Sequence, residues 1–217
     1  MKIGIIGSGF VGRATGVGCL EKEHDVLFYD INEALLLKLK EIGLNTTNNL
    51  DELIDFAETF MVCVPTPSTK EGVDLSFVRD VAEKFKNSVG DKTCCFVIRS
   101  TVTPGTTEEI CDYLPNNVCV IFNPEFLNEK TALRDFSNPC RIVLGVKKDD
   151  DRYLNLMKVY ENFRAPIQVV DFTTAELIKY ASNCFLATKI SFFNQLKILC
   201  DKLDANIEDV RYGVMSH

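Results

Sequence analysis

The sequence has no long apolar run, no paired cysteine motif and no excess of positive charge. None of its apolar stretches approaches the roughly 18 residues that a membrane-spanning helix needs. Met1 and Lys2 lead directly into an apolar strand-like run, so we expect no signal peptide. These absences predict a cytoplasmic protein without a membrane partner.

The charge and the cysteines exclude further classes. The net charge is -7 and the acidic residues are spread along the chain, which argues against a broad surface for nucleic acid or anionic membranes. The nine cysteines are an odd number, and no two have CxxC spacing. We therefore expect no metal site and predict reduced thiols that are mostly small core residues, as at Cys63, Cys94, Cys95 and Cys119.

Short apolar runs alternate with helical patterns over the first 170 residues. Strands apolar on both faces, alternating with helices, predict a doubly wound, mostly parallel Rossmann-type α/β sheet covered on both sides. The predicted strands are 2–6, 25–29, 59–64, 93–98, 118–122, 141–145 and 166–170, and the predicted helices are 10–21, 33–42, 50–57, 75–88, 105–114 and 150–163.

The pattern changes after Val170. Thr173 and Glu176 have capping-box spacing, and apolar residues then recur at helical steps with no breaker. We predict one helix of about 30 residues, roughly 45 Å long, which should pack on another domain or subunit. The predicted organisation is a domain at 1–172 and the start of a helical dimerisation domain at 173–217.

A glycine-rich turn follows the first predicted strand in "IGIIGSGFVGRATG". Gly7, Gly9 and Gly12 have the spacing that lets backbone N–H groups approach a pyrophosphate at the start of a helix. The second strand ends in Asp30, which can accept hydrogen bonds from an adenosine ribose and would repel a 2′-phosphate. This combination predicts a dinucleotide site that prefers NAD to NADP.

Three distinctive segments follow the third, fourth and fifth predicted strands: "VPTPST" at 64–69, "RSTVTPGTT" at 99–107 and "NPEFLNEKTALRDF" at 123–136. Ligands bind beyond the carboxyl ends of strands in open parallel sheets, so these segments are candidate binding loops. Prolines and hydroxyls in the first two also suit ordinary turns. In the third, Asn123 is a possible helix cap, and Glu125 and Glu129 would share one helix face.

Lys179 and Asn183 have the same i, i+4 spacing on the long predicted helix. A lysine charge beside a neutral amide donor suits the stabilisation of a developing oxyanion. A solvated lysine on a helix surface is the plainer alternative.

These motifs together resemble the UDP-glucose 6-dehydrogenase family, within the UDP-glucose/GDP-mannose dehydrogenase group. The resemblance covers essentially the whole chain: the glycine turn with Asp30, "VPTP", "STVTPGT", "NPEFLNE", and a long helix with K-x-x-x-N followed by "FFNQL". It implies the oxidation of a primary alcohol to a carboxylate with two NAD, converting UDP-glucose to UDP-glucuronate.

The resemblance also assigns expected roles to individual residues. The expected cofactor contacts are Gly7, Gly9, Phe10, Val11, Gly12, Asp30, Thr66, Thr101 and Glu129. The expected catalytic residues are Thr101, Glu125, Glu129, Lys179 and Asn183. The expected substrate contacts are Glu125, Phe126, Leu127, Lys179 and Asn183, within a nucleotide-sugar pocket to which 126–136 contributes.

Two departures from the family pattern stand out. Leu35 occupies a position where relatives often carry a basic residue that contacts the cofactor. The second oxidation needs a cysteine nucleophile, which the family places in a G-G-x-C-x-P-K-D loop that these residues do not contain. Cys184 comes nearest in setting, but we interpret it as a packing residue. We therefore expect a truncated chain without the carboxy-terminal domain, which binds NAD, forms a homodimer through the long helix and does not complete the reaction.

Other functions remain open on the sequence. UDP-glucose is preferred over GDP-mannose or a UDP-N-acetylhexosamine mainly because of "VPTP". A β-hydroxyacid dehydrogenase also joins a glycine turn to a helix with a Lys-x-x-x-Asn pair and needs no cysteine. A non-catalytic NAD-binding module that acts through dimerisation is the third alternative.

Overall fold

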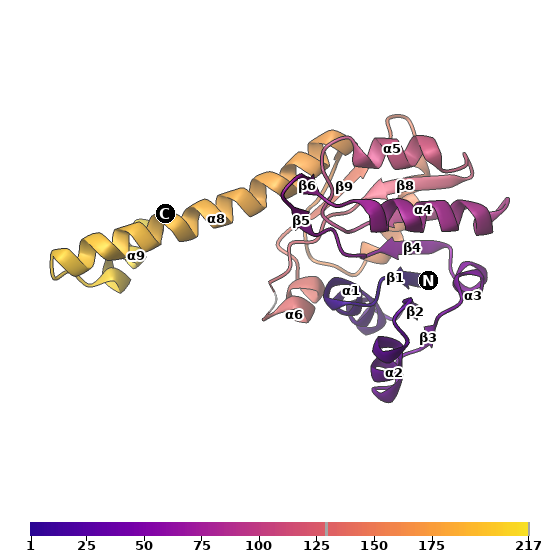
Figure 1. Cartoon of the computed structure of the whole chain (residues 1–217), viewed down its shortest axis with the longest axis horizontal. Helices are drawn as coiled ribbons and strands as arrows, with labels where there is room; N and C mark the ends of the chain where they lie inside the picture. Colours follow the sequence, from indigo (N-terminus) through magenta and orange to yellow (C-terminus); the bar gives the residue numbers. More distant parts are fainter. Residues whose placement is uncertain (129, 217) are drawn as a thin grey trace. The chain divides into compact units, whose positions relative to one another are not determined.

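The computed structural model describes residues 1–128 and 130–216. The chain divides into two compact units, the first from Met1 to Leu177 and the second beginning at Ile178. The first unit contains a sheet with helices on both faces, and the second is helical (Figure 1). The predicted fold class, a mostly parallel Rossmann-type sheet followed by a long helix, is confirmed.

The main sheet has eight strands in the order β10-β9-β8-β7-β4-β1-β2-β3. Its strands are β1 Lys2–Ile6, β2 Asp25–Tyr29, β3 Thr46–Thr47, β4 Thr59–Val62, β7 Cys94–Ile98, β8 Val118–Phe122, β9 Ile142–Val146 and β10 Ile167–Asp171. Neighbours pair in parallel except β8 and β9, where Phe122 lies opposite Gly145 in an antiparallel pair. From β1 the chain adds β2 and β3 on one side, and it then crosses to add β4 and β7 on the other side. Open sheets bind ligands at such a switch point, which here lies between β1 and β4.

Helices cover both faces of this sheet, with α4 and α5 on one side and α1 and α6 on the other (Figure 1). The helices of the first unit are α1 Phe10–Glu21, α2 Glu33–Glu41, α3 Leu50–Phe56, α4 Ser76–Val89, α5 Thr106–Tyr113, α6 Ala132–Ser137 and α7 Leu154–Met157. Every residue of β7 and β8 is buried. Both faces of the central strands therefore lie in the core, as a parallel sheet requires.

Different side chains fill the two faces. On the α4 side, Phe85 packs edge-on against Phe60 and Phe96, with ring centroids 4.9 and 5.0 Å away. On the α1 side, four cysteines join the aliphatic core: one directly after β4, one each in β7 and β8, and one in α1 (Cys63, Cys95, Cys119 and Cys19). All nine cysteines are free thiols, and the predicted burial of Cys63, Cys94, Cys95 and Cys119 is confirmed.

The second unit consists of α8, which spans Phe172–Lys202 and begins in the first unit, and α9, which spans Ile207–Met215. The side chain of Asn206 caps α9 by accepting from the Glu208 backbone N–H at 2.9 Å. Many large apolar side chains of this unit are exposed: Phe185, Leu186, Ile190, Phe192, Ile198, Leu199, Leu203 and Tyr212. Among the described residues, no helix is both long and apolar enough to cross a membrane.

Four local predictions were wrong or incomplete. The predicted helix at 150–163 is broken into α7 and two 3-10 turns, Asp151–Tyr153 and Lys158–Tyr160. The predictions also lacked the two-residue strand β3, the helix α6 and the small hairpin of β5 Ser68–Thr69 and β6 Gly72–Val73.

The predicted capping box of Thr173 and Glu176 at the start of α8 was wrong. Asp171, not Thr173, accepts the cap hydrogen bonds, from the backbone N–H of Thr174 at 2.9 Å and from its hydroxyl at 2.6 Å. Glu176 instead points to α5, where its carboxylate accepts three hydrogen bonds from Gly105 and Thr107. A buried carboxylate is stabilised by several donors, which the local box does not supply.

Candidate functional site

The glycine turn lies between β1 and α1. Gly7 has φ of +87°, a conformation that suits glycine, and a Cβ on Gly12 would lie 1.9 Å from the carbonyl oxygen of Gly7. A Cβ on Gly9 would meet nothing within 4 Å. Gly9 is the N-cap of α1, and no side chain caps this helix. The N-terminal N–H groups are thus available for an anion, which is the arrangement that holds a pyrophosphate.

Asp30 follows β2 at the same edge of the sheet. One carboxylate oxygen accepts from the Ser8 backbone N–H at 2.7 Å, and the other accepts from the Asn32 backbone N–H at 2.9 Å. Each oxygen can accept a further hydrogen bond, so the carboxylate is fixed and still able to bind a ribose hydroxyl.

A cavity of about 540 Å³ opens beside these residues, along the carboxyl ends of β1, β2, β4 and β7. Most of the predicted cofactor residues line it: Gly7, Gly9, Phe10, Val11, Asp30, Thr66 and Thr101. Gly12 is buried behind the turn and acts through close packing. Leu35 also lines the cavity, so the unusual residue occupies cofactor-facing space. The glycine turn, the Asp30 carboxylate and the volume of this cavity fit a dinucleotide.

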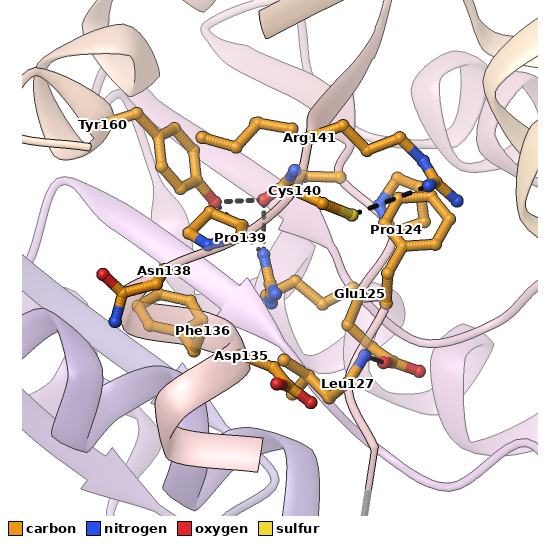
Figure 2. Close-up of a pocket in the computed structure, with 14 residues that line it drawn as sticks. Pro124, Glu125, Leu127, Asp135, Phe136, Asn138, Pro139, Cys140, Arg141 and Tyr160 are labelled. Carbon is orange, nitrogen blue, oxygen red and sulfur yellow. Dashed lines mark hydrogen bonds between the residues drawn. The ribbon is translucent and has the colours of Figure 1, made fainter. Parts of the chain in front are cut away.

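A second cavity of about 260 Å³ adjoins the first and is lined mainly by the residues after β8 and α6 (Figure 2). Three of the five predicted substrate contacts line this cavity: Glu125, Phe126 and Leu127. Glu125 and Arg99 line both cavities. The two cavities therefore share a wall that carries one acidic and one basic side chain.

The backbone after β8 differs from the prediction. Residues 123–128 form no helix, so Glu125 does not lie on a helix face and Asn123 is not a helix cap. A carboxylate oxygen of Glu125 accepts from the backbone N–H of Leu127 at 2.6 Å, which holds the segment in a local turn. The polar side chain of Asn123 is buried, and it donates to a backbone carbonyl of β9.

A buried polar cluster of Arg99, Asn123 and Tyr160 supports the shared wall. Arg99 Nη1 donates to the Asn123 side-chain oxygen and to the Tyr160 hydroxyl, the latter at 3.1 Å. Tyr160 also donates to the Asn123 oxygen, and Asn123 Nδ2 donates to the carbonyl of Val143 at 2.9 Å. Sequence reasoning missed this cluster, since its members lie on separate elements.

The electrostatics of the cluster follow from its burial. Burial alone would lower the pKa of Arg99, but the side chains around it, Tyr160 first, outweigh that effect and the pKa is raised. Burial raises the pKa of Tyr160 to about 12. Arg99 is therefore a permanent positive charge and Tyr160 a neutral donor at neutral pH.

The outer part of the smaller cavity carries a second arginine. The guanidinium of Arg141 stacks on the ring of Phe126, 4.0 Å from its centroid, and Nη1 lies 3.7 Å from the sulfur of the exposed Cys140 (Figure 2). Asp135 of α6 accepts from the Asn128 backbone N–H at 3.0 Å, which ties the end of the segment 123–128 to this helix. The cavity thus combines cationic, apolar and acidic surfaces, which suits a polar ligand with an anionic part.

The remaining predicted site residues are Lys179, Asn183 and Glu129. Lys179 and Asn183 lie one turn apart on α8, in the second unit, whereas Glu125 and Thr101 belong to the first. Cys184, interpreted from the sequence as a packing residue, is exposed on the same helix. Glu129 lies outside the residues that the structure describes.

Comparison with known families gives two matches along the chain. Residues 34–164 match the NAD binding domain of the UDP-glucose/GDP-mannose dehydrogenase family, and residues 173–217 match the central domain of that family. The first match begins after the glycine turn. The turn is therefore identified by its own backbone geometry and not by the family match. The cofactor of the cavity along β1 and β2 is therefore NAD.

Relatives cover the chain almost completely. UDP-glucose 6-dehydrogenase of Rickettsia felis is 38% identical over 99% of this chain and 53% of its own length. An uncharacterised protein of Methanocaldococcus jannaschii, MJ1054, is 37% identical over 99% of this chain and 27% of its own length. The chain spans about half the length of the UDP-glucose 6-dehydrogenases that it matches.

Solved structures agree with this relationship. A UDP-glucose dehydrogenase from Pyrobaculum islandicum matches with a TM-score of 0.88 and 31% identity, over 98% of this chain and 56% of that one. GDP-mannose dehydrogenase from Pseudomonas aeruginosa matches with a TM-score of 0.87 and 28% identity, over 100% of this chain and 57% of that one. With both family matches falling on the observed elements, the chain belongs to the UDP-glucose/GDP-mannose dehydrogenase family.

Proposed function

We propose that these residues form the NAD-binding part of an enzyme that oxidises the primary alcohol of UDP-glucose to the carboxylate of UDP-glucuronate. The observation that carries this proposal is the wall that the dinucleotide cavity and the smaller cavity share, at Arg99 and Glu125. A dehydrogenase must bring a cofactor and a substrate into contact, and two adjoining cavities with one common wall provide that arrangement.

The cofactor cavity assigns a task to each of its residues. The N-terminus of α1 at Gly9 would hold the pyrophosphate, and Asp30 would accept from the adenosine ribose. Thr66 and Thr101 line the same cavity and supply hydroxyl groups for further contacts. NAD, when bound, supplies a hydride acceptor, and the chain's residues orient it toward the shared wall.

The reacting end of the substrate would lie near Glu125, with Phe126 and Leu127 as further contacts. By resemblance to the family, Thr101 would position a water, Glu129 would assist the final hydrolysis, and Lys179 with Asn183 would stabilise the oxyanion.

UDP-glucose is favoured over other nucleotide sugars by "VPTP" and by the names of the relatives that are 36 to 38% identical. GDP-mannose is the second candidate, because a GDP-mannose dehydrogenase matches the fold about as well as a UDP-glucose dehydrogenase does. A β-hydroxyacid dehydrogenase is a weaker alternative, since the family matches do not point to it.

The proposed organisation is an NAD-binding domain at 1–172 and a helical domain from 173 that pairs two copies through α8. The exposed apolar side chains of the second unit favour such a homodimer. Light scattering on the purified chain tests it, with a mass of twice 24.4 kDa expected. A purely monomeric chain at micromolar concentration would contradict the dimer.

The function is tested by binding and turnover on the 217-residue chain. We expect NAD to bind more tightly than NADP, and UDP-glucose to bind more tightly than GDP-mannose, both measured by calorimetry. Since these residues contain no G-G-x-C-x-P-K-D loop, we expect no steady production of UDP-glucuronate. Tighter binding of GDP-mannose, or reduction of NAD by small 3-hydroxy acids, would favour the corresponding alternative. NAD binding without any nucleotide-sugar binding would favour the non-catalytic module.

A further inference from the structure

Arg99 is buried at the end of β7, with an exposed fraction of 3%. Its Nη1 is fully used by Asn123 and Tyr160. Its Nε is also buried, and it finds no hydrogen-bond partner among the described residues. A buried donor without a partner is costly, so Arg99 is not retained at this cavity wall for the stability of the fold alone.

The charge of Arg99 is also incompletely balanced within the protein. Among the described residues, no carboxylate forms an ion pair with this guanidinium, and its hydrogen-bond partners Asn123 and Tyr160 are both neutral. The Glu125 carboxylate acts on Arg99 only through space, as a weaker influence than Tyr160. Buried arginines are normally paired with an anion, most effectively a carboxylate, whose two oxygens match the guanidinium fork. A ligand that carries a carboxylate would supply the missing negative charge.

The position of Arg99 selects the part of the ligand that it meets. Arg99 lines the dinucleotide cavity and the smaller cavity together, so it lies where the reacting end of a substrate approaches the cofactor. The diphosphate of a nucleotide sugar would lie farther from the cofactor than the carbon that is oxidised. The oxidation changes that carbon from a neutral alcohol into a carboxylate.

We propose that Arg99 is a binding residue for the product, with its guanidinium donating to the carboxylate that the oxidation creates. This inference rests on the proposed function, because it takes the product to be a nucleotide sugar acid. Arg99 then contributes little to the affinity for the neutral alcohol and much to the affinity for the acid. The chain therefore binds the nucleotide sugar acid more tightly than the corresponding alcohol.

The test measures affinities of the 217-residue chain for UDP-glucose and UDP-glucuronate by calorimetry or ligand-observed NMR, with saturating NADH. We expect Arg99→Met and Arg99→Lys to lower the affinity for UDP-glucuronate about tenfold or more. The affinity for UDP-glucose should fall less than about threefold. Arg152→Lys is the matched control, because Arg152 pairs with Asp150 outside both cavities. NADH binding by fluorescence reports that each variant is folded.

A second measurement needs no variant. The carboxamide analogue of UDP-glucuronate keeps the shape of the acid but has no charge, and we expect it to bind the wild-type chain about tenfold more weakly than the acid. Equal affinity of the wild-type chain for the acid and the amide overturns the proposal. An equal loss of affinity for UDP-glucose and UDP-glucuronate in the Arg99 variants also overturns it, because it would indicate that Arg99 binds the diphosphate or has a structural role. A wild-type chain that binds NADH and neither nucleotide sugar overturns the proposed function itself.

Discussion

The carboxylate of Glu176 accepts two hydrogen bonds from Thr107, one from the backbone N–H at 2.8 Å and one from the hydroxyl at 2.6 Å. Its other oxygen accepts from the Gly105 backbone N–H at 2.7 Å. Glu176 is completely buried in the first turns of α8, and Gly105 is the N-cap of α5. The start of the long helix is therefore fastened to the N-terminus of α5 by one carboxylate, whose charge the helix dipole stabilises.

Replacing this carboxylate should cost stability. We expect Glu176→Ala to lower the free energy of unfolding by about 3 kcal/mol, because three buried donors lose their acceptor. Urea denaturation measures the change. Glu208→Gln, in an exposed pair with Arg211, is the control and should change stability by less than about 1 kcal/mol. A similar small effect for Glu176→Ala would contradict the anchoring role.

Two glycines of the turn should respond differently to alanine. Gly12→Ala forces a Cβ within 1.9 Å of the Gly7 carbonyl, so we expect it to destabilise the fold and to abolish NAD binding. Gly9→Ala places its Cβ in open space, so we expect stability to change by less than about 1 kcal/mol while NAD affinity falls at least about tenfold. Thermal unfolding and NAD calorimetry separate the two effects. Unchanged NAD affinity in Gly9→Ala would argue against a pyrophosphate at this turn.

Asp30 should determine the choice of cofactor. Asp30→Ser removes the negative charge and keeps a short acceptor, so we expect NAD affinity to fall about tenfold and NADP affinity to rise. The ratio of the two dissociation constants is the measurement. Glu33→Ser, a nearby acidic residue that does not line the cavity, is the control and should leave the ratio unchanged. If Asp30→Ser left the ratio of the two dissociation constants unchanged, the adenosine ribose would not bind at Asp30.

Stability should decline in alkaline solution. Burial raises the pKa of both Cys19 and Cys63 from 9.0 to about 12. Above pH 9 the unfolded chain loses these thiol protons while the folded chain retains them. The unfolded state then binds fewer protons, and the free energy of unfolding falls as the pH rises, by about 1 kcal/mol per thiol at pH 10.

Urea titrations at pH 8, 9 and 10 check this dependence. The Cys19→Ala/Cys63→Ala variant should lose less stability between pH 8 and pH 10 than the wild-type chain does. Cys140→Ala, at an exposed position, should behave like the wild type. An identical slope in all three proteins would show that other groups control the alkaline transition.

The sequence was sufficient for features that depend on near neighbours along the chain. The glycine turn and Asp30 were predictable because a strand, a tight turn and a helix follow one another within about 20 residues. The alternation of apolar runs likewise predicted the sheet, since both faces of its central strands are buried. Helix boundaries agreed to within one or two residues for α1, α4 and α5.

The features that failed depend on tertiary contacts. Arg99, Asn123 and Tyr160 lie on different elements, and no local pattern marks them as one cluster. Glu176 had the spacing of a capping box, but the donors of α5 form a better buried site for its carboxylate. Glu125 was placed on a helix by its spacing, whereas its carboxylate accepts from the Leu127 backbone and the segment stays extended or turned.

The connection that carries Thr101 is held at both of its ends. The backbone N–H groups of Arg99 and Ser100 donate to the Val62 carbonyl at 2.9 and 3.2 Å, and Gly105 is bound to Glu176. These hydrogen bonds restrain the loop before any ligand arrives. Its conformational entropy is lost during folding and not during cofactor association, which leaves more of the contact energy to appear as affinity.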